Sequence, residues 1–144
     1  MIWRETKRDV QVFLSADVSR IAGVSLRQLQ WWDERNVISP RKQGHRRVYL
    51  REQVLEVLTA ISLRRKGLSL QKIRRVLGLL RSQAEPPFRG ALGSRREWYL
   101  LTDAHSVCLE AQLERIVDML VDATRPMYVV NLRDQIKHLI STKG

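Results

Sequence analysis

The sequence contains a helix stop and a helix start that are separated by a single residue. Apolar residues recur at helical spacing from Ser15 to Ala22, and Gly23 readily adopts the left-handed backbone that ends a helix. Ser25 and Gln28 then form an S-x-x-Q capping box, which starts a second helix. Two short helices joined this tightly must turn a corner, which is the arrangement of a helix-turn-helix. In such a unit the second helix enters the major groove of DNA.

The end of the second helix leads into a basic, turn-rich segment. The two together read L-Q-W-W-D-E-R-N-V-I-S-P-R-K-Q-G-H-R-R-V-Y from Leu29 to Tyr49, with a pair of tryptophans at the end of the helix. Asn36 tolerates the left-handed conformation that ends a helix, and Pro40 and Gly44 bracket a basic loop before a short alternating strand. We predict a two-stranded hairpin, or wing, beside the second helix. A solvated charged loop is the ordinary alternative for a basic turn, but the adjacent helix pair favours a wing that contacts nucleic acid.

All of the excess positive charge lies in one half of the chain. Residues 1–81 hold 18 Lys and Arg against 7 Asp and Glu, whereas residues 82–144 hold 8 of each. This distribution predicts a polyanionic partner for the first half, and the helix pair selects double-stranded DNA among the candidates. The sequence has no apolar run of membrane-spanning length and no apolar core of a secretory signal, so we expect a cytoplasmic, nucleoid-associated protein with no membrane partner.

Two further helices are predicted in the basic half. One covers the apolar-periodic stretch that ends at Gly67, and the other starts at the capping residue Ser69 and continues to about residue 81. The predicted fold is therefore a mainly α N-terminal winged helix-turn-helix domain of four helices over residues 1–81.

Residues 13–80 resemble the DNA-binding domain of the MerR family of transcriptional regulators. The resemblance rests on F-L-S-A-D-V-S-R-I-A-G-V-S, L-Q-W-W-D-E-R-N-V-I-S-P, G-H-R-R-V-Y and R-R-K-G-L-S-L-Q-K-I, in this order. The chain departs from the family pattern at Gln30, where Arg is usual, at Trp31 and Trp32, where Tyr is usual, and at Asn36, where Gly is usual. Trp31 is a candidate backbone contact, and Trp32 is expected in the core.

Fourteen residues are predicted to contact DNA, because they project from the second helix, belong to the hairpin or end the third helix. They are Ser25, Arg27, Gln28, Gln30, Trp31, Arg35, Arg41, Lys42, His45, Arg46, Arg47, Tyr49, Arg64 and Arg65.

The neutral half is predicted to hold a linker and a small module. Residues 82–96 are rich in Pro, Gly and Ser and are expected to form a linker, since their prolines and glycines disfavour the long dimerising helix that is usual in the MerR family. Residues 97–144 show the pattern of a small α+β (ββαβα) module. A module of this size buries little surface alone, so we expect a homodimer through it. Trp98, Tyr99 and Tyr128 are expected in its core or interface.

Catalytic and metal-binding chemistry have no support in the sequence. The three histidines are scattered, no nucleotide-binding or hydrolase motif occurs, and Cys108 is the single cysteine. We predict no enzyme activity, no cofactor and no metal site.

Three functions fit these features. The first is a sequence-specific, dimeric transcriptional regulator, which the family resemblance implies would act on a palindromic promoter site beside RNA polymerase. The second is an architectural or recombination-accessory protein that bends DNA without an effector-controlled switch. The third is an adaptor whose neutral module recruits a protein.

Overall fold

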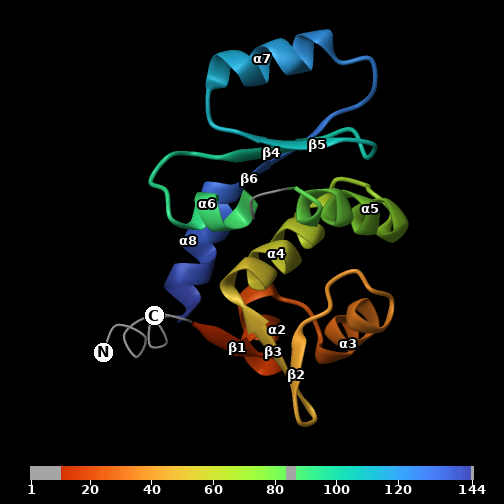
Figure 1. The fold of residues 1–144 in the computed structure, drawn as a ribbon, viewed down its shortest axis with the longest axis vertical. Coiled ribbons are helices and arrows are strands. Elements are labelled where there is room, and N and C mark those ends of the chain that lie inside the picture. Colours follow the sequence, from red (N-terminus) through yellow and green to blue (C-terminus); the bar gives the residue numbers. More distant parts are fainter. Residues whose placement is uncertain (1–10, 84–86, 144) are drawn as a thin grey trace.

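The computed structural model describes residues 11–83 and 87–143, and it shows a helix-rich protein with two small antiparallel sheets (Figure 1). Residues 1–10 and 84–86, which the sequence analysis assigns to the basic half and to the linker, lie outside the described residues, as does Gly144. One hydrophobic core extends through both described stretches.

The first two helices, α2 (Ser15–Ala22) and α3 (Leu26–Glu34), form the tight corner. Gly23 adopts φ 70° and its N–H donates to the Ser19 carbonyl, which ends α2. The Ser25 hydroxyl accepts from the Gln28 N–H at 3.0 Å, and the Gln28 side chain accepts from the Ser25 N–H at 3.2 Å. This reciprocal cap satisfies two free donors at the start of α3. Asn36, at φ 58°, turns the chain away after α3.

The basic hairpin belongs to a sheet of three strands, where the sequence predicted two. Strands β2 (Arg41–Gln43) and β3 (Arg46–Leu50) form the hairpin, and β1 (Val12–Leu14) pairs with the other edge of β3. Phe13 lies opposite Tyr49, and both side chains are fully buried. The sequence did not reveal β1 because three residues are too few to show alternation and its partner strand lies far downstream.

Helix α4 (Arg51–Arg65) is the centre of the molecule. Its buried residues lie on several sides, because it packs against α2, α5, α6 and α8 and against strands of both sheets. Helix α5 (Leu70–Arg81) begins at Ser69, whose hydroxyl accepts from the Lys72 N–H at 3.3 Å.

The segment predicted as a linker contains a helix, α6 (Pro87–Leu92). Phe88 and Ala91 are buried in the common core, and α6 packs against α4 and α8. The sequence did not predict this helix, because prolines and glycines have low helix propensity. Its stability comes from the burial of an aromatic side chain rather than from helix propensity. The division of the chain into two domains remains a prediction.

The remaining elements are three strands, which form a second sheet, and two helices, and this sheet lies between two helical layers. In chain order they are β4 (Tyr99–Thr102), β5 (Val107–Glu110), α7 (Leu113–Asp122), β6 (Tyr128–Asn131) and α8 (Leu132–Lys143), and β4 is the central strand. The second sheet separates helix α7 from the rest of the molecule (Figure 1). The half-buried Cys108 in β5 contacts Met119 on α7, with 3.9 Å between the two sulfur atoms. Helix α8 returns along α4 and α2, where His138 Nε2 contacts the Ile21 carbonyl.

Candidate nucleic-acid interface

Helix α3 presents a polar face to solvent while its other face is buried. Leu29 and Trp32 pack into the core, as the sequence predicts for Trp32. The opposite face borders a hollow of about 480 Å³ lined by Ser25, Arg27, Gln28, Gln30, Trp31 and Glu34. Gln30 is partly engaged, because its amide Nε2 donates to Glu34 at 3.2 Å. The hollow therefore brings together five of the predicted contact residues.

Trp31 and Arg35 form a stacked pair at the end of α3. The Arg35 guanidinium carbon lies 4.1 Å from the centroid of the Trp31 ring, and Trp31 is 44% exposed. A cation over an indole face keeps its charge while the ring fixes its position. The pair can therefore present both a flat apolar surface and a positive charge to a sugar–phosphate backbone.

Helix α5 adds two polar residues to this surface that the sequence analysis missed. Gln71 and Arg74 line a groove of about 400 Å³ together with Trp31, Arg35, Val37 and Leu70. The signal in the sequence was the polar side of the amphipathic α5, opposite its buried stripe. The sequence could not predict that the polar side of α5 lies beside α3, because the packing of α5 against the core decides which element is next to that side.

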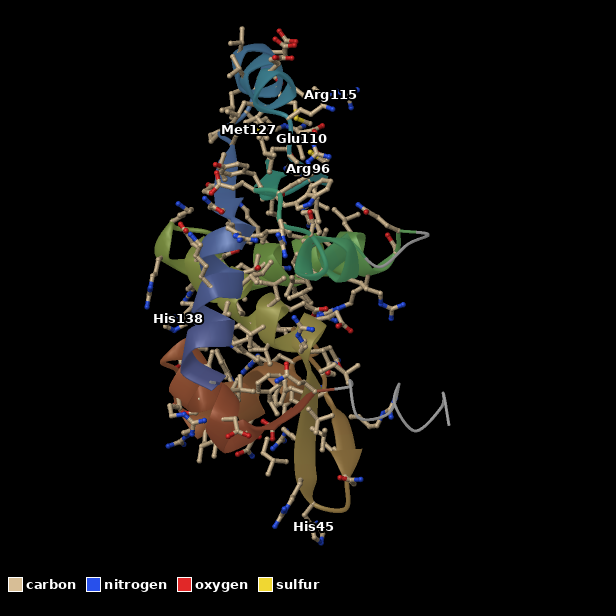
Figure 2. All side chains as sticks on the ribbon, turned by 90° about the vertical axis from the view of Figure 1, so that its left-hand side faces the viewer. His45, Arg96, Glu110, Arg115, Met127 and His138 are labelled. Atoms are coloured by element: carbon tan, nitrogen blue, oxygen red, sulfur yellow. The ribbon has the colours of Figure 1, made fainter. Side chains whose placement is uncertain are left out.

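The hairpin supplies a second exposed basic element. Arg41, Lys42, His45 and Arg46 are all exposed. His45 lies at the tip of the hairpin, at the end of the molecule away from Glu110 and Arg115 (Figure 2). A groove of about 270 Å³ separates the hairpin from the starts of α2 and α3, and its lining includes Leu26 on α3 and His45, Arg46 and Arg47 on the hairpin.

Two neighbouring hairpin arginines differ in their surroundings. Arg46 is exposed, and no ion pair involves it within the described residues. Arg47 is half-buried, and its Nε donates to Asp33 Oδ2 on α3 at 2.6 Å. The sequence predicts the same role for both arginines, whereas the structure leaves Arg46 available to DNA and attaches Arg47 to α3.

The remaining three predicted contacts differ in their surroundings. Tyr49 is fully buried, and burial raises the pKa of its phenol, so its prediction as a DNA contact is corrected. Arg64 donates to the Leu68 carbonyl at 3.4 Å, which closes the α4–α5 turn. Arg65 lines a groove with Gln135 of α8, and α8 lies on the side of α4 away from α3 and α5 (Figure 1).

In residues 11–83 and 87–143, no three His, Cys, Asp or Glu side chains are grouped to hold a metal ion. No helix of the described part is both long and apolar enough to cross a bilayer.

The corner of α2 and α3, with an exposed polar face and a basic hairpin beside it, defines a DNA-binding protein of the helix-turn-helix class. Comparison with known proteins supports this class. Residues 13–80 match the model of the MerR HTH family regulatory proteins, which confirms the resemblance seen in the sequence.

The chain is also similar to curated helix-turn-helix regulators. The HTH-type transcriptional regulators GlnR of Bacillus anthracis and of Bacillus cereus are each 30% identical to the chain over 83 residues, which cover 57% of this chain and 64% of each relative. The crystal structure of a transcriptional regulator of the MerR family from Bacillus cereus aligns with 93% of this chain and 100% of its own, at 20% identity and a TM-score of 0.42.

Proposed function

We propose that the protein is a sequence-specific transcriptional regulator whose residues 11–83 act as a four-helix winged helix-turn-helix domain. The observation that carries the proposal is the position of the exposed side of α3 next to the exposed cations of the β2–β3 hairpin, on the half of the chain that holds the whole positive excess. Such a surface matches the major groove with one element and the phosphate backbone with the other.

The exposed residues divide between base reading and backbone contact. Arg27 and Gln28 lie in the first turn of α3, where a recognition helix meets base edges, and their side chains suit guanine and adenine respectively. Lys42, His45 and Arg46 on the hairpin suit phosphates, which position the protein without reading sequence. In this proposal Arg35 and Arg74 hold the backbone on the other side of α3.

The second half of the proposal is a homodimer formed through a ββαβα module. Helix α7 has an exposed apolar stripe of Leu113, Val117, Leu120 and Val121, and among these Val117 is 55% and Val121 is 76% exposed. Contiguous exposed apolar side chains mark protein interaction surfaces. Helix α7 lies at the end of the molecule opposite the hairpin, so pairing through it leaves the DNA surface uncovered (Figure 1).

On this basis we propose that the dimer acts in the cytoplasm on a palindromic promoter site beside RNA polymerase. Selection of bound duplexes from a random library tests the proposal, because two half-sites related by a two-fold axis report both sequence reading and dimerisation. Footprinting with and without RNA polymerase then locates the site. Protection at dispersed sites away from promoters would instead identify an architectural DNA-binding protein.

Arg27→Ala offers the sharper test of base reading. Loss of one bidentate base contact is expected to remove about 1–3 kcal/mol of discrimination at a single position of the selected site. Arg95→Ala is the matched control, because it removes the same charge from an exposed position in the other half of the chain. Selection with Arg27→Ala that returns the wild-type site unchanged would exclude Arg27 as a reading residue.

A further inference from the structure

One acidic side chain lies between the two DNA-contacting elements. Asp33 is on α3, and its Oδ2 accepts from Arg47 Nε at 2.6 Å and lies 3.8 Å from Lys42 Nζ. Lys42 and Arg47 are directly opposite each other in the β2–β3 ladder, so their side chains lie on the same face of the hairpin. A single carboxylate therefore holds one cation from each strand.

We propose that Asp33 is a positioning residue, which clamps the β2–β3 hairpin to α3 and thereby sets the spacing between the base-reading helix and the phosphate-contacting hairpin. The inference rests on the proposed function of this surface in DNA binding. It adds a role for a residue that is neither exposed to the duplex nor part of the apolar core.

Burial distinguishes the Asp33–Arg47 pair from the other ion pairs of the surface. The side chains of Asp33 and Arg47 are 11% and 22% exposed, whereas Arg115, which lies 3.7 Å from Glu110, is 68% exposed. Exposed pairs contribute little because water and salt screen them, but a short, partly desolvated guanidinium–carboxylate contact has a defined geometry. The Asp33–Arg47 contact can therefore fix the position of the hairpin relative to α3, in addition to lowering the local positive charge.

The hairpin depends on this contact because its outer strand has no apolar anchor. β2 is an edge strand, and all three of its residues are exposed. The connection from α3 to β2 is tied at its base, since the Ser39 hydroxyl donates to the Asp33 carbonyl at 3.3 Å and Gln53 Nε2 donates to the Ser39 carbonyl at 3.4 Å. Asp33 thus fixes the hairpin through its side chain and the base of the hairpin through its backbone.

The negative charge of Asp33 by itself opposes DNA binding. Its charge is repelled by phosphates, and it partly neutralises two cations that could otherwise release counterions from DNA. If the carboxylate acted through charge alone, its removal would tighten binding to every duplex. Under the clamp, its removal loosens the hairpin and weakens the discrimination between duplexes.

Asp33→Asn in the full chain separates these two cases, because Asn keeps the size of the side chain and loses its charge. We would measure binding to a duplex with the selected site and to a scrambled duplex, each over a range of salt. We expect scrambled binding to be equal or tighter, with a salt slope steeper by about one. The ratio of specific to scrambled affinity is expected to fall about tenfold, a loss comparable to one base contact.

Two further variants keep this inference falsifiable. Glu52→Gln removes one negative charge from the first turn of α4, where the carboxylate has no ion pair within the described residues, and it is expected to leave the specificity ratio unchanged. Asp33→Glu retains the charge and is expected to recover part of the ratio. Equal tightening of both duplexes by Asp33→Asn and by Glu52→Gln would overturn the clamp, as would a parallel loss of both affinities together with a lower melting temperature.

A readout without DNA distinguishes this inference from the proposed function. In the free protein, the Arg47 Nε–H resonance is expected to be shifted and slow to exchange, and to lose both properties in Asp33→Asn. An unchanged resonance in the variant would refute the clamp even if the wild type binds its site. A wild type that shows the resonance but does not distinguish the two duplexes would refute the proposed function, and with it the positioning role.

Discussion

Arg46→Ala tests whether the hairpin contacts the DNA backbone. Arg46 is exposed, so its guanidinium is free to contact a phosphate and its removal leaves the core intact. Each phosphate contact contributes about 0.9 to the slope of log affinity against log salt concentration. When the salt concentration rises from 50 to 200 mM, the factor by which affinity falls is therefore about 3.5-fold smaller for the variant than for the wild type.

The assay is a fluorescence-anisotropy titration of a labelled duplex at four or more salt concentrations. Arg95→Ala serves as the control, because Arg95 is an exposed arginine in the loop between α6 and β4, which lies in the other half of the molecule (Figure 1). We expect parallel lines for Arg95→Ala and the wild type and a shallower line for Arg46→Ala. Equal slopes for all three proteins would refute the assignment of the hairpin to the backbone, and a shallower slope for Arg95→Ala would show that only the net charge matters.

Three further predictions concern stability and assembly. Leu29→Ala truncates a side chain that is 1% exposed where α3 packs into the core, so denaturant unfolding is expected to show a loss of about 2–5 kcal/mol; a loss well below this range would mean that α3 is not held by this contact. Val117→Asp places a charge in the exposed stripe of α7 and is expected to convert a sedimenting dimer to a folded monomer, while an intact dimer would place the interface elsewhere. Asp103 accepts from the N–H groups of His105 and Ser106 at 2.8 Å, and these bonds hold the pKa of its carboxyl below the usual range. A lowered pKa contributes stability above the ordinary Asp pKa that is lost as the pH falls through the folded value, so Asp103→Asn should lose less stability than the wild type on acidification; identical pH profiles would contradict this.

Features that depend on residues close together in the sequence could be predicted from the sequence. The α2–α3 corner follows from Gly23 and from the Ser25–Gln28 cap, which are interactions within one turn of backbone. The apolar spacing of α5 and the start of α5 at Ser69 are equally local. The ordered motifs of residues 13–80 were sufficient to show the resemblance that the family model confirms.

Features that depend on contacts between residues far apart in the sequence could not be predicted from it. Strand β1 exists because Phe13 pairs with Tyr49, and α6 exists because Phe88 reaches the common core. Tyr49 illustrates the same limit for the site: its position in a basic hairpin motif predicts exposure, but the antiparallel pairing of β3 with β1 turns its ring inward.

By itself, the sequence determined where helices start and stop, which half carries the positive charge and which family the first half resembles, because capping, periodicity and composition are local or additive properties. Only the tertiary structure decided which of the candidate residues share a surface. It buried Tyr49, separated Arg65 from α3, joined Gln71 and Arg74 to it, and paired Arg47 with Asp33 while leaving Arg46 exposed. The physical reason is that the alternation of a strand and the face of a helix specify the direction of a side chain, whereas its neighbours depend on how distant segments pack.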